Sequence, residues 1–395
     1  MPRTIIHLDL DAFFCAVEEQ HNPSLVGQPF AVGGRPEERG VVASCSYAAR
    51  QYGIHSAMPM AQARQRCPHL IIVPSRFGAY RAASAAVMAR LTALTPLVEQ
   101  ISIDEAFLDV TALETSGAAL ARQLQRTIKE DLGLPCSLGV ATNKLVAKIA
   151  TDVGKAAART GNAPTALVVV PPGAEAAFLA PLPTGALWGV GPRTAERLAA
   201  LGIRTIDDLA RRPEAELVRR FGKHGAALAR HAQGRDERPI QVEHEAKSLS
   251  KERTFARDVQ READLRQTIK EQAAAVAQSL QRKELRGVTI TLKLRWPDFT
   301  TLTRQTTLPT PTNQETIIAD AALRLFEQTW QIGQAVRLVG VGVSGLSTIT
   351  YQASLWESAT PLAEKRQQVE AALAQLRARF GEEIVRWGSE WKQAL

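Results

Sequence analysis

Cysteine is scarce in this chain. Its four cysteines, in 395 residues, are Cys15, Cys45, Cys67 and Cys136, and no two are close enough to form a CxxC pair. That spacing excludes a local cysteine-based zinc or dithiol motif. We therefore expect four reduced thiols in a cytosolic protein.

Long apolar runs are also missing. No stretch approaches the roughly 20 consecutive apolar residues that a membrane-spanning helix needs. The opening segment MPRTIIHLDLDAFF carries Asp9 and Asp11 inside its apolar run, which a secretory signal peptide would not do. Internal repeats and low-complexity segments are absent. We expect a soluble, cytoplasmic protein with no membrane association.

The chain does have an excess of positive charge. Its formal net charge is +8, from 48 Lys and Arg against 40 Asp and Glu. A basic balance of this size suits a polyanionic partner, although many basic proteins never bind nucleic acid. The length exceeds one compact core and predicts roughly two to four domains.

Strands and helices alternate over the first part of the chain, which predicts an α+β fold. The expected elements are a strand ending at Asp9, a strand at 40–44, a helix at 76–95, two apolar runs meeting at Asp104-Glu105, a helix at 118–131, a strand at 137–141 and a helix at 143–153. Between them, SYAARQYGIHSAMPM predicts a helix broken by Gly53 and Pro59.

The pattern changes near Pro171-Pro172. From there to about residue 230 it is all-helical, with a helix-hairpin-helix pattern around Gly189-Val190-Gly191. Residues 231–245 are polar and charged and predict a linker. A βαββαβ unit follows, with strands at 247–255, 288–296, 299–308 and 337–346 and helices near 265–280 and 313–330. The tail holds a short apolar segment at 351–356 and an amphipathic helix at 362–380.

Three acidic residues interrupt apolar segments at expected strand ends: Asp9, Asp104 and Glu105. A charge at such a place is costly unless it has a partner such as a metal ion. Mg²⁺ prefers oxygen ligands, and polymerases use two such ions about 4 Å apart to stabilise the attacking and leaving oxygens. Each acid alone also fits a solvated or salt-bridged strand end. By themselves the three indicate a metal site and no particular reaction.

Four segments in order give this pattern a context. HLDLDAFFCAVEE and SIDEAFLDV resemble the two palm motifs of Y-family (lesion-bypass) DNA polymerases. RGVVASCSYAARQYGIHSAMP resembles their fingers segment, and NKLVAKIATDVGK resembles the palm helix that ends in a triphosphate-contacting lysine. The resemblance covers about residues 1–356 and is nearest to the DNA polymerase IV branch.

The resemblance implies a right-hand polymerase: a ferredoxin-like palm, small fingers, a helix-hairpin-helix thumb and a βαββαβ little finger. It divides the chain into palm (1–11 and 77–165), fingers (12–76), thumb (166–232), linker (233–245), little finger (246–347) and a tail (348–395).

Carried over by position, Asp9, Asp104 and Glu105 are the catalytic ligands of two Mg²⁺ ions, for which Mn²⁺ can substitute. The backbone carbonyl of Leu10 helps to hold the nucleotide-bound ion. Asp11 matches a position that is not a direct ligand, so a structural role is expected for it.

The resemblance also assigns residues that bind the dNTP. Ser44, Tyr47, Arg50 and Lys155 match the grip on the triphosphate, and a forked guanidinium, a compact ammonium and two hydroxyls suit phosphate oxygens. Taken alone, Tyr47 and Arg50 equally fit a partly exposed helix face.

Phe14 matches the steric gate, an aromatic ring beneath the sugar that would collide with a 2′-hydroxyl and so favours deoxyribonucleotides. Without the resemblance, Phe13 and Phe14 are simply adjacent core aromatics.

One segment departs from the family. The palm lysine is usually followed by a Lys-Pro-x-Gly turn, whereas this chain continues KAAARTGNAPTALVVV. The surroundings of Lys155 therefore differ from the family pattern, and Arg159 is a candidate to share its role.

Two regions are candidates for binding primer-template DNA. Gly189 and Gly191 at a helix start can present backbone N–H groups to a phosphate, or can form a plain interhelical turn. A polar strand face with Lys293 and Arg295 can follow a duplex backbone, or can simply be solvated. Arg304 on the neighbouring strand is grouped with this face, and Lys251 and Arg253 are further candidates.

The segment Gln352-Ala353-Ser354-Leu355-Trp356 resembles a clamp-binding peptide, in which Gln352, Leu355 and Trp356 dock into a sliding (β) clamp. The alternative is that Leu355 and Trp356 pack on the chain's own C-terminal helix.

The sequence therefore predicts a monomeric, template-directed DNA polymerase that adds dNTPs to a primer 3′-hydroxyl. The resemblance adds low fidelity, no proofreading and a role in DNA damage tolerance. Two alternatives remain: a two-metal nuclease, which needs no triphosphate grip, and a DNA-binding scaffold with an inactive palm, against which the presence of all three carboxylates argues.

Overall fold

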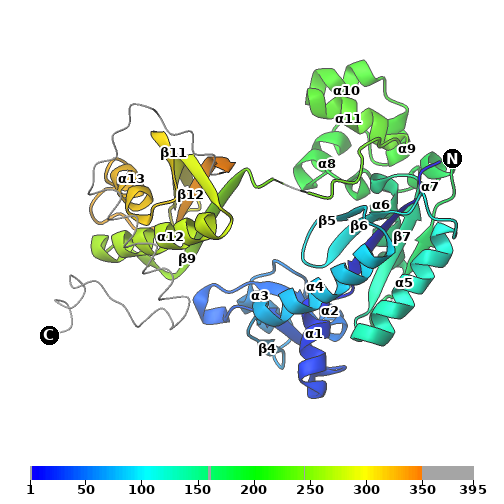
Figure 1. Cartoon of the computed structure of the whole chain (residues 1–395), viewed down its shortest axis with the longest axis horizontal. Helices are drawn as coiled ribbons and strands as arrows, with labels where there is room; N and C mark the ends of the chain where they lie inside the picture. Colours follow the sequence, from blue (N-terminus) through cyan, green and yellow to red (C-terminus); the bar gives the residue numbers. More distant parts are fainter. Residues whose placement is uncertain (1, 159–161, 244, 349–395) are drawn as a thin grey trace.

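Three β-sheets, each with its own helices, organise the chain (Figure 1). The computed structural model describes residues 2–158, 162–243 and 245–348. The sheets hold five, three and four strands, and apolar side chains form a separate core beside each sheet. None of the helices described is long and apolar enough to cross a membrane.

The five-stranded sheet has the strand order β5-β6-β1-β7-β8. Its strands are β1 (Ile5–Leu10), β5 (Val98–Gln100), β6 (Glu105–Asp109), β7 (Cys136–Ala141) and β8 (Leu167–Val169). Helices α4 (Phe77–Leu94) and α5 (Gly117–Leu132) pack on one face and α6 (Lys144–Ala157) on the other. The elements expected from the sequence are thus confirmed to within a few residues, and the two apolar runs around Asp104-Glu105 form the antiparallel pair β5–β6.

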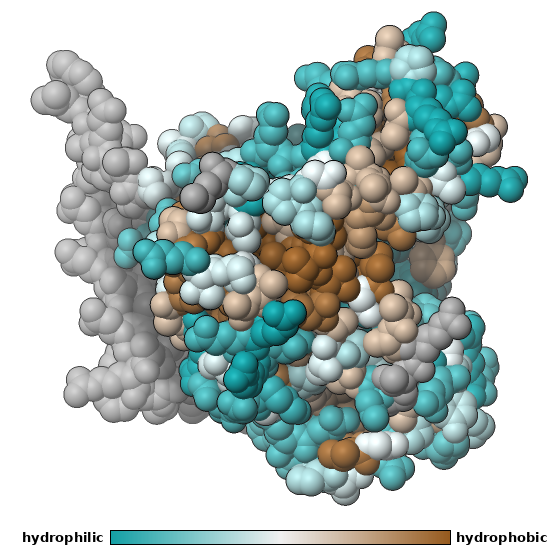
Figure 2. All heavy atoms as spheres, turned by 90° about the vertical axis from the view of Figure 1, so that its right-hand side faces the viewer, coloured by the Kyte–Doolittle hydropathy of each residue, from teal (hydrophilic) through white to brown (hydrophobic). Residues whose placement is uncertain are grey.

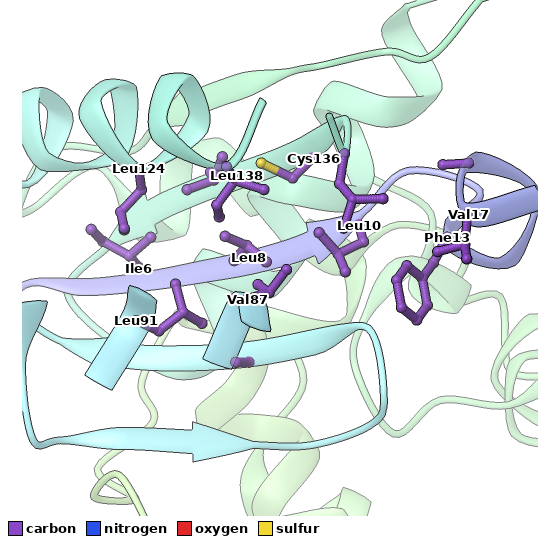
Figure 3. Close-up of a cluster of buried hydrophobic side chains, with 14 of the residues drawn as sticks. Ile6, Leu8, Leu10, Phe13, Val17, Val87, Leu91, Leu124, Cys136 and Leu138 are labelled. Atoms are coloured by element: carbon purple, nitrogen blue, oxygen red, sulfur yellow. The ribbon is translucent and has the colours of Figure 1, made fainter. Parts of the chain in front are cut away.

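Successive side chains of a strand point to opposite faces, and in strand β1 the two faces differ. One face is entirely apolar, whereas the other carries His7 and Asp9. Ile6, Leu8 and Leu10 lie in the core shared with α4 and α5, as Figure 3 shows. His7 and Asp9 therefore point to the opposite face, under α6. Leaving Asp9 on the face away from the main core is what places its carboxylate near polar partners.

The three-stranded sheet, with the order β3-β2-β4, forms a small unit beside the first. Its elements are α1 (Phe13–His21), β2 (Phe30–Gly33), β3 (Val42–Cys45), α2 (Tyr47–Arg50), α3 (Met60–Arg66) and β4 (Ile71–Val73), with 3-10 turns at Pro23–Leu25 and Pro36–Glu38. The broken helix expected here is confirmed: Gly53 has a left-handed φ of 71°, and Pro59 is the N-cap of α3.

A helical unit follows. The strand just before it, β8, belongs to the five-stranded sheet, whereas the sequence had placed it with the helices. The helices are α7 (Glu175–Leu179), α8 (Pro192–Ala199), α9 (Ile206–Ala210), α10 (Glu214–Phe221) and α11 (Lys223–Ala232), with a 3-10 turn at Thr184–Ala186. The boundary expected at 165/166 is wrong by one strand, because β8 pairs in parallel with β7 and completes the five-stranded sheet. A three-residue strand is too short to give a clear sequence pattern.

The segment expected to be a linker is anchored over its first half. Asn143 donates to the Gly234 carbonyl at 2.8 Å, and the buried Asp236 carboxylate accepts from the Leu145 amide at 3.2 Å. The Gln241 amide donates to Glu99 at 2.8 Å. Residues 234–241 therefore lie against the first sheet unit, and the polar composition of this segment reflects hydrogen bonds to that unit.

The last described unit is the expected βαββαβ domain, which is confirmed. It consists of β9 (Ser248–Val259), α12 (Glu262–Arg282), β10 (Leu285–Arg295), β11 (Thr301–Thr312), α13 (Glu315–Glu327) and β12 (Val336–Thr348). The sheet order is β11-β10-β12-β9, and both helices pack on one face. No described helix packs on the other face, which is called the open face below (Figure 1).

The surface is mixed in character. On the face that Figure 2 shows, apolar atoms gather near the middle, and hydrophilic side chains cover the upper and lower parts. All four cysteines are buried and unpaired, as the sequence predicted.

Candidate active site

Strand register brings two of the three predicted acids together. β1 and β6 are antiparallel, and Asp9 lies directly opposite Glu105. Directly paired residues share one face of a sheet, so both carboxylates lie on the face that α6 covers. Asp104 is in the turn before β6, where its carbonyl accepts a hydrogen bond from the Leu10 amide at 3.0 Å.

Helix α6 presents three polar side chains to this face at intervals of three and four residues, which place them in one row. Lys148 Nζ lies 2.9 Å from the Glu105 carboxylate, and Lys155 Nζ lies 2.7 Å from Asp9. Between them, Thr151 pairs with the buried His7 ring at 2.9 Å. Two carboxylates at the site thus each have an ammonium partner.

Asp104 is held by its own turn. Ser102 Oγ donates to the Asp104 carboxylate at 2.5 Å and accepts from the Glu105 amide at 3.0 Å. This fixes the backbone between β5 and β6 and leaves the Asp104 side chain partly exposed at the rim of the site.

Burial controls the charge of Asp9. Burial raises its pKa to about 7; Lys155 opposes this shift, and the nearby Glu105 carboxylate adds to it. Burial also lowers the pKa of His7, with Lys148 and Lys155 adding to the effect, so His7 is neutral. An acid with a raised pKa beside a second acid would be stabilised in its charged form by a cation.

The three acids do not form a ready-made metal cluster. Within the described part of the chain, no group of three or more His, Cys, Asp or Glu side chains is arranged to hold a metal ion. The reason is that Asp9, Glu105 and Asp104 are turned toward Lys155, Lys148 and Ser102. The donor set itself, carboxylates with a neighbouring backbone carbonyl, is the type that Mg²⁺ binds. The space between these acids already holds a cationic group, because Lys155 Nζ lies 2.7 Å from Asp9 and 3.4 Å from Asp11.

Most of the predicted metal- and nucleotide-binding residues line one cavity of about 200 Å³, with Glu105 and Tyr47 as the exceptions. Those that line it are Asp9, Leu10, Phe14, Ser44, Arg50, Asp104 and Lys155. The five-stranded unit contributes the acids and Lys155, and the three-stranded unit contributes Ser44 and Arg50. Negative groups that suit a cation and positive groups that suit an anion therefore line the same cavity, and one of the positive groups, Lys155, is in direct contact with Asp9.

Tyr47 is placed differently. It lines a neighbouring cavity of about 120 Å³ together with Asp11, Cys15 and Ser46. Its hydroxyl is buried and has no hydrogen-bond partner among the described residues, and the Arg50 guanidinium lies 4.7 Å from its ring centroid. Burial raises the pKa of Tyr47, with Asp11 adding to the effect, so the hydroxyl remains a donor.

The backbone at Ala12 redirects the chain from strand to helix. Ala12 has φ 46° and ψ 46°, a left-handed conformation that non-glycine residues adopt at some cost. The turn lets Asp9 at the end of β1 and Phe14 on α1 face the same cavity. Phe14 is half-buried, and its ring stacks on Tyr80 with the centroids 4.2 Å apart.

Asp11 has the structural environment that the sequence predicted. It is almost fully buried, Ser137 Oγ donates to its two oxygens at 2.9 and 3.0 Å, and the Thr165 amide donates at 3.0 Å. It thereby ties the segment after α6 to the end of β1. Arg159, proposed to share the role of Lys155, lies outside the described residues.

Sequence reasoning missed two residues at the site. Lys148 lies seven positions before Lys155 in NKLVAKIATDVGK, and this two-turn spacing was the available signal. Tyr80 contacts Phe14, but nothing in the local sequence of α4 links it to α1.

The predicted DNA contacts of the last domain divide between two faces. Lys293 pairs with Gly340 and Thr303, and Arg295 with Thr301, on the open face. Grouping Arg304 with them is wrong, because Arg304 pairs with the buried Leu292 and so belongs to the helix-covered face, at the exposed edge strand β11.

Lys251 and Arg253 also lie on the helix-covered side. Lys251 pairs with the buried Val341, and Arg253 forms an ion pair at 3.6 Å with Glu271 of α12. On the open face, Lys293 is paired with Glu252 at 2.9 Å.

The remaining candidates are placed as follows. Gly189 has a φ of 95° and precedes Gly191, the N-cap of α8, so the expected turn between helices is present. Gln352, Leu355 and Trp356 and the predicted tail helix lie outside the described residues.

Family models match three separate segments of the chain. Residues 8–152 match the impB/mucB/samB family, residues 172–203 the helix-hairpin-helix motif of that family, and residues 246–355 its C-terminal domain.

Curated relatives are similar over most of the chain. DNA polymerase IV of Streptomyces coelicolor is 44% identical over 92% of this chain and 75% of that protein. DNA polymerase IV of Alkalilimnicola ehrlichii is 42% identical over 88% and 96%, and that of Listeria monocytogenes 39% over 89% and 97%.

Two solved structures are similar in fold. The Y-family DNA polymerase chimera Dbh-Dpo4(243-245)-Dbh has a TM-score of 0.76 at 27% identity, over 87% of this chain and 99% of that one. The insertion ternary complex of Dbh DNA polymerase has a TM-score of 0.62 at 28% identity, with the same coverage.

Proposed function

Since the chain belongs to the impB/mucB/samB family of Y-family DNA polymerases, and is therefore a DNA-directed DNA polymerase, we propose that the 200 Å³ cavity is its nucleotidyl-transfer site. The observation that carries the proposal is the meeting of acids, cations and Phe14 in one cavity. The α+β, multidomain architecture with its helix-hairpin-helix motif is that of the family.

The acids of the site are proposed to hold two Mg²⁺ ions, with Mn²⁺ as a substitute. Asp9, Asp104, Glu105 and the Leu10 carbonyl are the ligands. DNA polymerases depend on divalent metal, which supplies charge stabilisation at the attacking and leaving oxygens. For Asp9 and Glu105 to act as ligands, their carboxylates must exchange Lys155 and Lys148 for the ions.

The cations are proposed to bind the dNTP triphosphate. Arg50 and Lys155 line the same cavity as Asp9 and Asp104, and Ser44 adds a hydroxyl. The Tyr47 hydroxyl, which has no hydrogen-bond partner among the described residues, belongs to the neighbouring cavity and is proposed to donate to a phosphate oxygen. Phe14, half-buried at the cavity wall, is proposed as the steric gate.

We also propose the division into palm, fingers, thumb and little finger. Strand β8 is assigned to the palm, because it belongs to the five-stranded sheet. Primer-template DNA is proposed to contact the open face of the little finger at Lys293 and Arg295 and the thumb turn at Gly189 and Gly191. Low fidelity, absence of proofreading and a role in damage tolerance are also proposed, by analogy with the family. Clamp binding by Gln352, Leu355 and Trp356, and a monomeric state, stay predictions.

The proposal is tested by primer extension with Asp104→Ala. We expect at least a thousandfold loss of dNTP incorporation, roughly the scale on which phosphoryl-transfer sites lose activity when a key charged group is missing. Asp131→Ala is the matched control, because Asp131 is an exposed acid of α5 whose partner is Arg90. Full extension by Asp104→Ala would refute the site.

A two-metal nuclease is the alternative that uses the same carboxylates. The same assay separates the two, because a nuclease shortens the labelled primer whereas a polymerase lengthens it. The presence of Arg50 and Lys155 in the same cavity as the acids favours the polymerase, since a nuclease has no triphosphate to hold.

A further inference from the structure

Behind Phe14 lies a buried polar cluster to which the proposed site assigns no role. The Tyr80 ring is parallel to the Phe14 ring to within 13°, with the centroids 4.2 Å apart. Tyr80 is completely buried, and its hydroxyl donates to the Glu18 carboxylate at 2.6 Å. Phe14 lines the 200 Å³ cavity, whereas Tyr80 does not. Tyr80 is therefore the support against which the Phe14 ring rests.

Glu18 connects two helices at this point. It follows Phe14 by one turn of α1, and its side chain is almost completely buried. Arg76, the N-cap of α4 and one turn before Tyr80, donates from Nε at 3.0 Å, and its Nη2 contacts the second carboxylate oxygen. Such a bidentate pair fixes direction as well as distance. One carboxylate thus holds the tyrosine hydroxyl and ties α1 to α4.

Stability alone does not require this arrangement. Burying a carboxylate is costly, and well-packed apolar side chains of similar size often stabilise a protein as much as a buried ion pair does. What the ion pair adds is a defined geometry. A ring that must exclude one hydroxyl group from a sugar has to be held to within roughly 0.5 Å, and a stacked ring alone can slide by more than that.

We propose that Glu18 is a positioning residue for sugar selection: through the Tyr80 hydroxyl and the Arg76 guanidinium it holds the Phe14 ring where a 2′-hydroxyl would collide with it. The inference rests on the proposed polymerase site and on Phe14 as its steric gate.

The test compares kcat/KM for a dNTP with that for the matching rNTP in single-nucleotide primer extension. Glu18→Gln keeps the shape and removes the charge, and Tyr80→Phe keeps the ring and removes the tethered hydroxyl. Both are expected to lower the dNTP to rNTP ratio about tenfold, mainly by raising kcat/KM for the rNTP. Phe14→Ala is expected to lower the ratio further.

Glu99→Gln is the matched control. Glu99, on β5 of the five-stranded sheet, is also a buried carboxylate with a cationic partner, because it pairs with Lys144 at 2.7 Å. A purely structural role for Glu18 predicts that both glutamine variants lower the thermal midpoint and that neither changes the sugar ratio. The proposal predicts a changed ratio for Glu18→Gln alone.

A double variant locates the effect. In the Phe14→Ala background, adding Glu18→Gln is expected to leave the ratio unchanged, because the ring that Glu18 positions is gone. Wild-type ratios in both Glu18→Gln and Tyr80→Phe, with a relaxed Phe14→Ala, would overturn the inference and leave the gate intact. A wild-type ratio in Phe14→Ala would overturn the gate and the inference together. If Glu18→Gln fails to fold, Tyr80→Phe carries the test.

Discussion

Lys155 has two roles at the proposed site. Lys155 neutralises Asp9 at 2.7 Å and lies 3.4 Å from Asp11, and it lines the cavity where a triphosphate is proposed to bind. A lysine on a flexible stem can change partners in this way, whereas the fork of Arg50 is suited to one planar group of oxygens. The same residue can therefore stabilise the ligand-free site and contact the nucleotide.

The Glu18 carboxylate gives a pH dependence with a definite sign. Burial acts to raise its pKa, but hydrogen bonds from Arg76 and Tyr80 outweigh burial and lower the pKa below its ordinary value. A depressed folded pKa contributes stability above the unfolded value, and that stability is lost as pH falls through the folded value. We predict that wild type is more thermally stable than Glu18→Gln at pH 7, with the difference shrinking below about pH 4.

Thermal unfolding of the two proteins from pH 7 to pH 3 checks this. An equal difference in thermal midpoint at every pH would show that the glutamine variant acts through packing instead of charge.

At the scale of elements, helix α6 organises the site. Its N-terminus is capped by Asn143, which accepts from the Val146 amide at 3.0 Å, and by Asp236. The helix lies very close to β7, because Gly139 has no side chain: an added Cβ would lie 2.0 Å from the Ala147 carbonyl oxygen. This close approach sets the distance between Lys148, Lys155 and the acids of β1 and β6.

Gly139→Ala is predicted to push α6 away from the sheet. We expect a loss of stability of about 1–3 kcal/mol from overpacking, together with a fall in kcat for dNTP incorporation. Gly78→Ala is the control, since Gly78 is exposed on α4 and nothing lies within 4 Å of an added Cβ. The control is expected to be neutral or stabilised by up to about 1 kcal/mol. Thermal unfolding and steady-state primer extension measure both effects, and equal behaviour of the two variants would contradict the packing argument.

At the scale of the whole molecule, a few side chains link units that are far apart in sequence. Arg39, beside the three-stranded sheet, forms an ion pair at 2.7 Å with Asp258 of β9 and also donates to the Phe255 carbonyl. Residues 234–241 fasten the start of the connecting segment to the first sheet unit. Among the described residues, the contacts of Arg39 with β9 thus join the last domain to the three-stranded unit.

The two faces of the last domain lead to a prediction for DNA binding. Lys293→Ala with Arg295→Ala is expected to weaken primer-template binding and to reduce the slope of log affinity against log salt by up to about 0.9 per lost phosphate contact. The matched pair Lys251→Ala with Arg253→Ala, on the helix-covered side, is expected to change the slope less. Fluorescence anisotropy over a salt series measures both, and a larger effect of the second pair would place the DNA on the other face.

Much of this fold followed from local pattern. The strict alternation of Ile290, Leu292 and Leu294 with Thr291 and Lys293 fixed β10, and each of these apolar residues is buried. The helices α4, α5 and α6 were found within a few residues: α4 is long and rich in alanine, and α5 and α6 have a regular apolar spacing. The short strand β8 and the anchored segment 234–241 were not, because both depend on partners distant in sequence.

By itself, the sequence determined the longer elements, the βαββαβ unit and, through its resemblance to a family, most of the residues proposed for the site. Only the tertiary structure decided how these side chains are used. The register of β1 with β6 placed Asp9 opposite Glu105, and the close packing of α6 on Gly139 brought two lysines to them. Register in the last sheet likewise separated Arg304 from Lys293 and Arg295. The physical reason is that periodicity fixes which residues share a face of one element, whereas the pairing of elements fixes which faces meet.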